Sequence, residues 1–147
     1  MTVSGLRSEI LFLSDNSSGD LIKRRAIGAY LGLAVGDALG ATVEFMTPSE
    51  IRAQYRDHRE MTGGGWLRLR RGQITDDTEM SLALGRSILQ HGSVDPHAAA
   101  DAFSEWMRRK PIDIGNTVRR GIANYRRTGQ PIMDGNEFDA GNGACMR

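Results

Sequence analysis

Apolar residues along this chain recur at helical spacing in five stretches. Steps of three and four residues place such positions on one side of a helix, whereas the alternation of apolar and polar residues that is typical of a strand is missing from the sequence. Turn-forming and helix-stopping residues separate the stretches. The pattern predicts an all-α fold of five or six helices, over residues 21–41, 48–55, 79–91, 96–110 and 116–127.

The first predicted helix is apolar over almost its whole surface. Glycine recurs at every fourth position from Gly28 to Gly40, which forms a smooth stripe that another backbone can approach closely. A helix of this kind is buried in a protein core or in a membrane. Asp37 lies inside the run, and a carboxylate is costly within a membrane span. We therefore expect the central core helix of a soluble domain and no membrane span.

Composition limits the kinds of partner. The 147 residues include 19 Lys and Arg and 18 Asp and Glu, and the net charge of +1 gives no electrostatic case for binding nucleic acid or an anionic membrane. The single cysteine, Cys145, excludes an internal disulfide framework and predicts a reducing, cytoplasmic setting, with Cys145 as a small packing residue. Polar residues near the N-terminus predict a loosely ordered lead-in over 1–20, followed by a domain over 21–147.

The segment Thr75–Thr78, Thr-Asp-Asp-Thr, places several hard oxygen atoms within about one helical turn. Such oxygens suit Mg²⁺, Mn²⁺ or Ca²⁺ rather than zinc or copper. The same segment comes directly before a helical apolar pattern, where Thr or Asp commonly caps the helix. Asp76 and Glu79 also have the spacing of a capping box. Taken alone, the segment leaves metal binding and helix capping open.

Three further carboxylates lie at positions where they need a partner. Asp37 and Glu44 are about two helical turns apart near the end of the first predicted helix. Asp113 has apolar neighbours and lies just before the last predicted helix. A buried carboxylate needs a cation, backbone amides or a basic side chain, and an apolar setting suits it to proton transfer. Hydrogen bonds to neighbouring loops are the alternative for Asp37 and Glu44. A helix cap is the alternative for Asp113, although Asn116 is the better candidate for that cap.

Two glycine-rich segments remain. The loop of residues 63–66 lacks the Gly-Lys-Ser/Thr sequence of a phosphate-binding loop, so we expect a plain loop with Trp66 as an aromatic anchor. The closing segment has Gly or Asn at positions 135, 136 and 141–143, and these residues can adopt left-handed backbone angles. We expect their amides to line a pocket for phosphate or ribose.

Four blocks of the sequence resemble the ADP-ribosylglycohydrolase family. They are Gly36–Gly40 with Glu44-Phe45, Thr75–Met80, Asp113–Thr117 and Gly141–Arg147. The blocks occur in the same order as in that family, from about Ile22 to the end of the chain. Four matching blocks in that order are far more specific than a match to any single block. The resemblance is greatest to bacterial members that remove ADP-ribose from an arginine of the nitrogenase iron protein.

The resemblance implies an orthogonal helical bundle of the ADP-ribosylglycohydrolase type, of which this chain is the N-terminal part. It also implies two divalent cations, Mn²⁺ or Mg²⁺, whose first group of ligands is Thr75, Asp76 and Asp77. Glu44 and Asp113 match acidic residues close to the metals and the scissile bond, which makes them the catalytic acid and base candidates. The residues implied around the ADP-ribose are Asn116, Glu137, Gly141, Asn142, Gly143, Met146 and Arg147.

The implied reaction is metal-dependent hydrolysis of the N-glycosidic bond between ADP-ribose and a protein arginine, with the nitrogenase iron protein as the expected partner. The family completes its metal site with a downstream Asp-x-Asp-Thr cluster that this chain lacks. We therefore expect residues 1–147 to carry about half of the domain, to bind Mn²⁺ weakly and to hydrolyse nothing alone. Alternatives are action on another ADP-ribose linkage and a non-catalytic relative, although four retained carboxylates argue against the latter.

Overall fold

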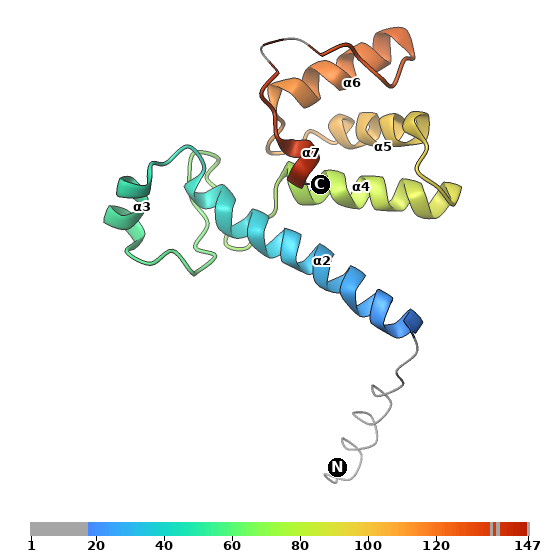
Figure 1. Cartoon of the computed structure of the whole chain (residues 1–147). Helices are drawn as coiled ribbons and strands as arrows, with labels where there is room; N and C mark the ends of the chain where they lie inside the picture. The colour runs from blue at the N-terminus through green and yellow to red at the C-terminus, as the bar shows by residue number, and fades with distance from the viewer. Residues whose placement is uncertain (1–17, 136, 138, 147) are drawn as a thin grey trace, which may run out of the picture. The chain divides into compact units, whose positions relative to one another are not determined.

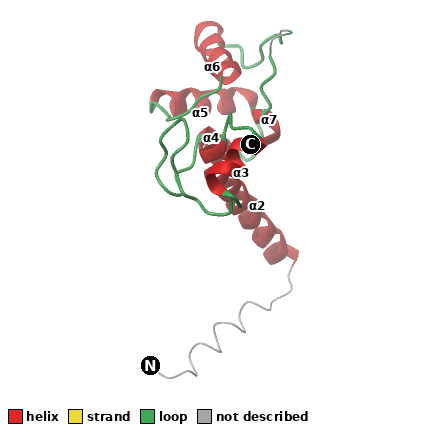
Figure 2. Cartoon of the chain, turned by 90° about the vertical axis from the view of Figure 1, so that its left-hand side faces the viewer, coloured by secondary structure: helices red, strands yellow, loops and turns green. Residues whose placement is uncertain are grey.

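The computed structural model describes residues 18–135, 137 and 139–146. The elements in this part of the chain are helices, and no strand occurs among them, as the sequence predicts (Figure 1, Figure 2). The chain divides into two compact units, residues 1–32 and 33–147. The predicted lead-in falls almost entirely outside the described residues.

Helix α2 (Ser18–Gly40) begins three residues before its predicted start and carries the run of glycines. The expectation of a buried core helix is wrong for the described structure, because only Ala38 is buried among residues 19–40. Within its own unit of the described chain, a side-chain carbon added at Gly36 would meet nothing within 4 Å. By length and composition alone, Gly19–Val43 is apolar enough to cross a membrane, which is weak evidence since core helices and signal sequences pass the same test.

A short helical stretch follows α2 and leads into the second confirmed helix. The 3₁₀ helix η2 (Ala41–Val43) ends at Glu44, and α3 (Pro48–Tyr55) begins after Thr47. The Thr47 backbone N–H donates to the Glu50 carboxylate at 2.6 Å, while the Glu50 N–H donates to the Thr47 hydroxyl at 3.3 Å. This reciprocal pair satisfies two amides at the helix start and fixes α3 where the Thr47-Pro48 pattern predicts it.

The core of the second unit is a stack of three helices, α4 (Asp76–His91), α5 (Pro96–Arg108) and α6 (Asn116–Thr128). Helix α4 packs on α5, and α5 packs on α6 (Figure 1). Their apolar stripes meet in one cluster, consisting of Met80, Trp106 and Ile122 with Ala83, Phe103, Met107, Ile114 and Val118 packed against it. The amphipathic periodicity read from the sequence is therefore the reason that these helices form and stack.

Both Gly92 and Gly129 end their helices in the left-handed conformation, at φ 75° and 71°. The glycines of the closing segment behave differently. Gly135 and Gly141 do not have positive φ angles, so these two glycines do not use the left-handed conformation open to them, and residues 143–146 form the short helix α7 (Gly143–Met146). Cys145 is exposed, which contradicts its expected packing role. Asn136 and Arg147 lie outside the described residues.

Candidate functional site

The Thr75–Thr78 segment forms the start of α4 without capping itself. Thr75 is the N-cap residue, but its side chain makes no capping hydrogen bond, and Asp76 is already the first helical residue. The expected capping box between Asp76 and Glu79 is absent, because the Glu79 carboxylate accepts a hydrogen bond from the Trp106 indole N–H at 2.7 Å instead. The cap has to come from elsewhere in the chain.

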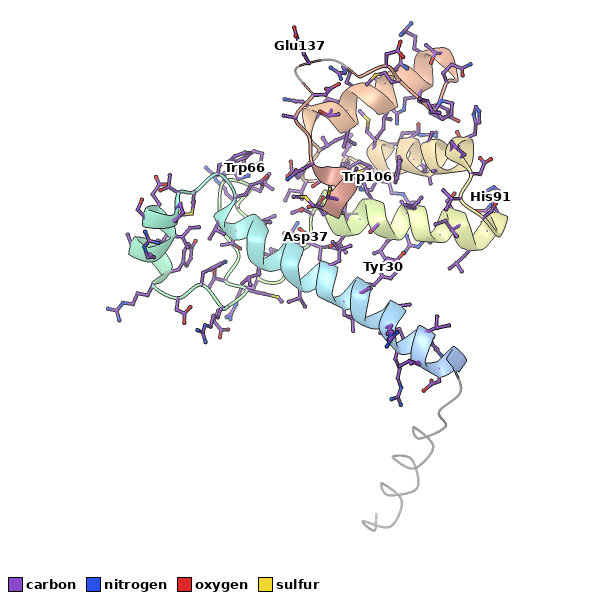
Figure 3. The ribbon with its side chains drawn as sticks, viewed as in Figure 1. Tyr30, Asp37, Trp66, His91, Trp106 and Glu137 are labelled. Atoms are coloured by element: carbon purple, nitrogen blue, oxygen red, sulfur yellow. The ribbon has the colours of Figure 1, made fainter. Side chains whose placement is uncertain are left out.

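Asp37, on the last turn of α2, supplies that cap (Figure 3). Its Oδ2 atom accepts the backbone N–H groups of Thr75 at 2.9 Å and Thr78 at 3.2 Å. Its two oxygens also accept both threonine hydroxyls, each at 2.5 Å. Four donors and the positive end of α4 therefore stabilise one carboxylate, which answers the question of what partner Asp37 has.

The two aspartates between these threonines are held in place by the same contacts. Thr75 and Thr78 are buried, Asp76 is only 8% exposed and Asp77 is half-buried. A segment anchored at both ends by hydrogen bonds to Asp37 has little freedom to move its central residues. The carboxylates of Asp76 and Asp77 are thus presented from a fixed backbone.

Asp113 lies in the connection between α5 and α6, and it is half-buried. Burial raises the pKa of Asp113 above that of an ordinary aspartate, and the negative charges of Asp76, Glu44 and Asp37 raise it further. One hydrogen bond, from the Ile114 N–H at 2.7 Å, opposes the shift. Three other predicted carboxylates are therefore near enough to Asp113 for their negative charges to act on it.

Neither of the two predicted capping residues, Asp113 and Asn116, caps α6. Gly115 is the N-cap residue, Asn116 is the first helical residue, and the Asp113 side chain binds only its own neighbour's amide. The capping alternative for Asp113 is therefore wrong. Its carboxylate remains next to the acidic cluster.

Glu44 reaches the cluster from the end of η2. It is exposed, and its Oε2 atom accepts a hydrogen bond from the Trp66 indole N–H at 2.9 Å. Glu44 also contributes to the raised pKa of Asp113, which places the two acid and base candidates in the same neighbourhood. Sequence reasoning treated Trp66 as a plain loop anchor and gave no signal of this bond.

The donor set of the cluster suits a hard cation in kind but falls short in number. Asp76 and Asp77 provide carboxylate oxygens and Thr75 provides a hydroxyl oxygen, as Mg²⁺ and Mn²⁺ prefer. Among the described residues, however, no three Asp, Glu, His or Cys side chains are grouped closely enough to hold a metal ion. These residues by themselves thus offer part of a coordination shell.

Two of the residues expected around ADP-ribose, Asn116 and Gly141, lie near the start of α6. A side-chain carbon at Gly141 would lie 3.1 Å from the Thr117 hydroxyl, so the closing segment packs directly against α6 beside Asn116. Asp139 fixes this arrangement, because it accepts hydrogen bonds from Thr117 at 3.3 Å and from Arg120. Asp139 is not among the residues predicted from the sequence, although it is a carboxylate two residues before the Gly-Asn-Gly run of 141–143.

Four other members of the predicted ADP-ribose set lie elsewhere in the closing part of the chain. Asn142 accepts the Cys145 N–H at 2.9 Å, and Gly143 and Met146 lie in α7. Glu137 is exposed on the loop after α6 (Figure 3), and no contact among the described residues joins it to the acidic cluster. Arg147 lies outside the described residues.

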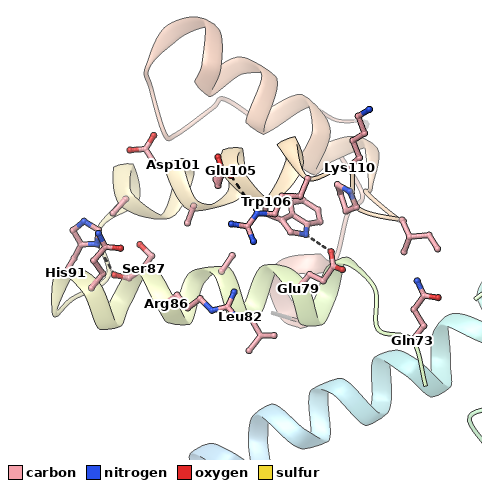
Figure 4. Close-up of a pocket in the computed structure, with 17 residues that line it drawn as sticks. Gln73, Glu79, Leu82, Arg86, Ser87, His91, Asp101, Glu105, Trp106 and Lys110 are labelled. Atoms are coloured by element: carbon pink, nitrogen blue, oxygen red, sulfur yellow. Dashed lines mark hydrogen bonds and ion pairs between the residues drawn. The ribbon is translucent and has the colours of Figure 1, made fainter. Parts of the chain in front are cut away.

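A separate cavity of about 730 Å³ runs along α4 and α5 (Figure 4). Glu79, Arg86 and Trp106 line it, and the Glu79–Trp106 hydrogen bond joins its two walls. The acidic residues 44, 76, 77 and 113 do not line this cavity. It is therefore distinct from the cluster that the sequence predicts.

The chain belongs to the ADP-ribosylglycohydrolase family, whose sequence profile matches residues 18–147. Its sequence is 59% identical over 130 residues to the ADP-ribosyl-[dinitrogen reductase] glycohydrolase of Rhodospirillum rubrum. It is 40% identical over 134 residues to the ADP-ribosylarginine hydrolase Tri1 of Pseudomonas putida. A solved chain described as an ADP-ribosylglycohydrolase-related protein complex matches the fold with a TM-score of 0.69 at 45% identity.

These matches cover most of this chain but less than half of each relative. The alignment takes in 88% of this chain and 44% of the Rhodospirillum rubrum protein. For the Pseudomonas putida protein the shares are 84% and 34%, and for the solved chain 84% and 40%. The helical fold described above is therefore the N-terminal part of the fold of these relatives.

Proposed function

We propose that the full-length protein hydrolyses the N-glycosidic bond between ADP-ribose and an arginine side chain of a protein. The observation that carries this proposal is that Asp76, Glu44 and Asp37 all act on Asp113, with the four carboxylates coming from three separate parts of the sequence. Family membership and the similarity to proteins named for hydrolysis of ADP-ribosylarginine support the choice of bond.

Asp113 is the residue best suited to move a proton in this reaction. Its raised pKa lets it hold a proton at a higher pH than an exposed aspartate does, so it can pass that proton to a departing nitrogen. Glu44, whose charge acts on Asp113, is the second acid or base candidate. A positioned acid or base of this kind typically contributes about 10²- to 10⁴-fold to a rate.

The proposal includes two divalent cations, Mn²⁺ or Mg²⁺. Thr75, Asp76 and Asp77 would hold them, together with ligands from outside the described residues. A bound cation would orient the ribose hydroxyls and lower the pKa of a coordinated water. The contribution of this chain is to fix the ligand segment through Asp37, so that the carboxylates need not reorganise on binding.

The proposed substrate protein is dinitrogen reductase, the iron protein of nitrogenase, acted on in the cytoplasm. The basis is the 59% identity to the Rhodospirillum rubrum protein, whose name states this target. Cys145 is the only cysteine of the chain, which accords with a reducing compartment.

The test is the release of ADP-ribose from arginine-modified dinitrogen reductase by the full-length protein, with and without Mn²⁺. We expect Asp76→Ala to lose at least about 10³-fold in rate, since several kcal/mol of charge stabilisation would depend on the cation. Asp57→Ala removes an exposed carboxylate paired with Arg59 and should match the wild type. Equal rates for wild type and Asp76→Ala would refute the metal assignment, and release from serine-linked substrate alone would refute the arginine linkage.

A further inference from the structure

The loop that carries Trp66 is fixed against the backbone that leads to Glu44. Gly65 has φ +68°, and a side-chain carbon there would lie 2.7 Å from the Thr42 carbonyl oxygen. The backbone groups of Gly64 and Leu69 exchange two hydrogen bonds of 2.8 Å, which close the loop. Trp66, labelled in Figure 3, is therefore held on a closed loop, and its indole N–H donates to Glu44.

Trp66 is joined there by a second aromatic ring. The ring centroids of Phe45 and Trp66 are 5.5 Å apart with their planes tilted by 58°. Phe45 is 81% exposed and Trp66 is 54% exposed, so both rings keep open faces. Glu44 precedes Phe45 in the chain and accepts the Trp66 indole N–H through one of its two oxygens, Oε2.

The backbone of Phe45 indicates that this arrangement is not a product of packing. Phe45 has φ +63°, a left-handed conformation that costs a bulky residue free energy. A ring that is 81% exposed recovers little of that cost by burial. Strained backbone of this kind clusters at binding and catalytic sites.

Two open aromatic faces beside a carboxylate suit a planar cation. A guanidinium group stacks on Trp and Phe, is more weakly hydrated than an ammonium group, and donates paired hydrogen bonds to carboxylates. Glu44 also lies close enough to Asp113 to raise its pKa, which puts this surface at the reacting end of the substrate rather than at a distant base.

We infer that Phe45, Trp66 and Glu44 form the subsite for the guanidinium of the modified arginine, and so select arginine-linked over other ADP-ribose linkages. This inference rests on the proposed function. The aromatic faces hold the cationic group from its first encounter through the reaction, and Glu44 fixes its orientation. Contacts made equally in the bound substrate and in the transition state affect KM rather than kcat.

The kinetic test uses full-length protein and ADP-ribosylated arginine substrate. We expect Trp66→Leu to raise KM about 3- to 30-fold with kcat within about twofold, the range that a cation–π contact provides. Trp66→Phe keeps an aromatic face and should retain most of the affinity. Leu89→Ala removes another exposed apolar side chain, far along α4, and should leave both constants unchanged.

A binding test separates this inference from the proposed function. The protein is labelled with 5-fluorotryptophan, and the Trp66 signal is assigned by its loss in Trp66→Leu. We expect N-acetyl-arginine amide to shift that signal and the neutral isostere N-acetyl-citrulline amide to leave it in place. No shift, or equal shifts, would overturn the subsite. A selective shift in a protein that releases no ADP-ribose would keep the subsite and reject the proposed reaction. If Trp66→Leu turned over arginine-linked substrate with an unchanged KM, the proposed reaction would stand and the subsite would be rejected.

Discussion

Asp37 is the residue on which the geometry of the acidic cluster depends most. A single carboxylate accepts two backbone N–H groups and two hydroxyls of the α4 start. The sequence marks Asp37 as a carboxylate in need of a partner, but the partner lies 38 and 41 residues away. Local spacing cannot reveal such a contact, so the capping interpretation of the Thr75–Thr78 segment identifies the helix start but not the side chain that supplies the cap.

Replacing Asp37 should therefore cost more than an ordinary surface change. We expect Asp37→Ala to lower the free energy of unfolding by about 2–4 kcal/mol, because it leaves buried donors at the α4 start without an acceptor. Urea unfolding of the full-length protein measures this loss. Asp20→Ala, which removes an exposed partner of Arg24 on the same helix, should change stability by less than about 0.5 kcal/mol. Similar losses for both variants would contradict the capping role.

Asp113 leads to a prediction about how the stability of the metal-free protein depends on pH. Because its pKa is raised in the folded state, the folded protein keeps a proton on Asp113 at pH values where the unfolded chain has lost it. Stability therefore falls as pH rises from the ordinary aspartate pKa through the raised one, and stays reduced above it.

Asp113→Asn should remove that fall. We expect the variant to gain stability relative to wild type as pH increases through this window, measured by urea unfolding in EDTA. Asp57→Asn serves as the exposed control. Parallel pH profiles for wild type and Asp113→Asn would show that burial among the acidic groups does not perturb this carboxylate.

At the scale of elements, the sequence predicts the helices well where local signals act. Thr47-Pro48, Asp95-Pro96, Gly92 and Gly129 all mark true helix ends, because capping and left-handed turns depend on neighbouring residues. The packing between helices depends on side chains far apart in sequence. The hydrogen bond between Glu79 of α4 and Trp106 of α5 cannot be inferred from the pattern, which offers only the capping-box spacing of Asp76 and Glu79 as one interpretation.

Trp106 should be the strongest stabilising contact between α4 and α5. We expect Trp106→Ala to cost about 3–5 kcal/mol and Trp106→Phe about 1–3 kcal/mol, since Phe keeps most of the packing but leaves the Glu79 carboxylate without its donor. Leu89→Ala, at a side chain that is 85% exposed, should stay within about 0.5 kcal/mol. Equal stabilities of Trp106→Phe and wild type in urea unfolding would refute the role of this bond.

Two glycines before α4, Gly65 and Gly72, allow the cost of a left-handed backbone to be separated from the cost of a steric clash. Gly65 and Gly72 have nearly the same φ, +68° and +70°, but only Gly65 approaches another backbone, that of Thr42. We expect Gly72→Ala to cost about 1–2 kcal/mol from conformation alone, and Gly65→Ala clearly more because the loop must also move. Thermal or urea unfolding of the two variants measures the difference, and equal costs would mean that the close approach is absent in solution.

At the scale of the whole molecule, the helical class and the family were predictable, and the burial of α2 was not. Its apolar surface and glycine stripe indicate a core helix, yet Leu31 is 62% and Val35 49% exposed. Periodicity shows that a surface is apolar but not which segment covers it. The site is likewise partial, since the carboxylates predicted from sequence come together without completing a metal shell.

This incompleteness gives a prediction for the 147 residues taken alone. We expect them to bind Mn²⁺ weakly and to release no ADP-ribose from modified arginine, because Asp76 and Asp77 lack a third acidic ligand among the described residues. Parallel assays of this segment and of the full-length protein measure the contrast. Turnover by the segment alone would show that these residues suffice.

The contact between Asp37 and the α4 start also bears on how the protein reaches its native state. The first turn of α4 obtains its acceptors only after a chain closure of about 40 residues, so this turn cannot mature early by local nucleation. The candidate ligands then become ordered in the same cooperative step that docks α2, and amide hydrogen exchange at Thr75 and Thr78 should report that step. For the same reason, evolutionary change at position 37 should be coupled to change at positions 75 and 78.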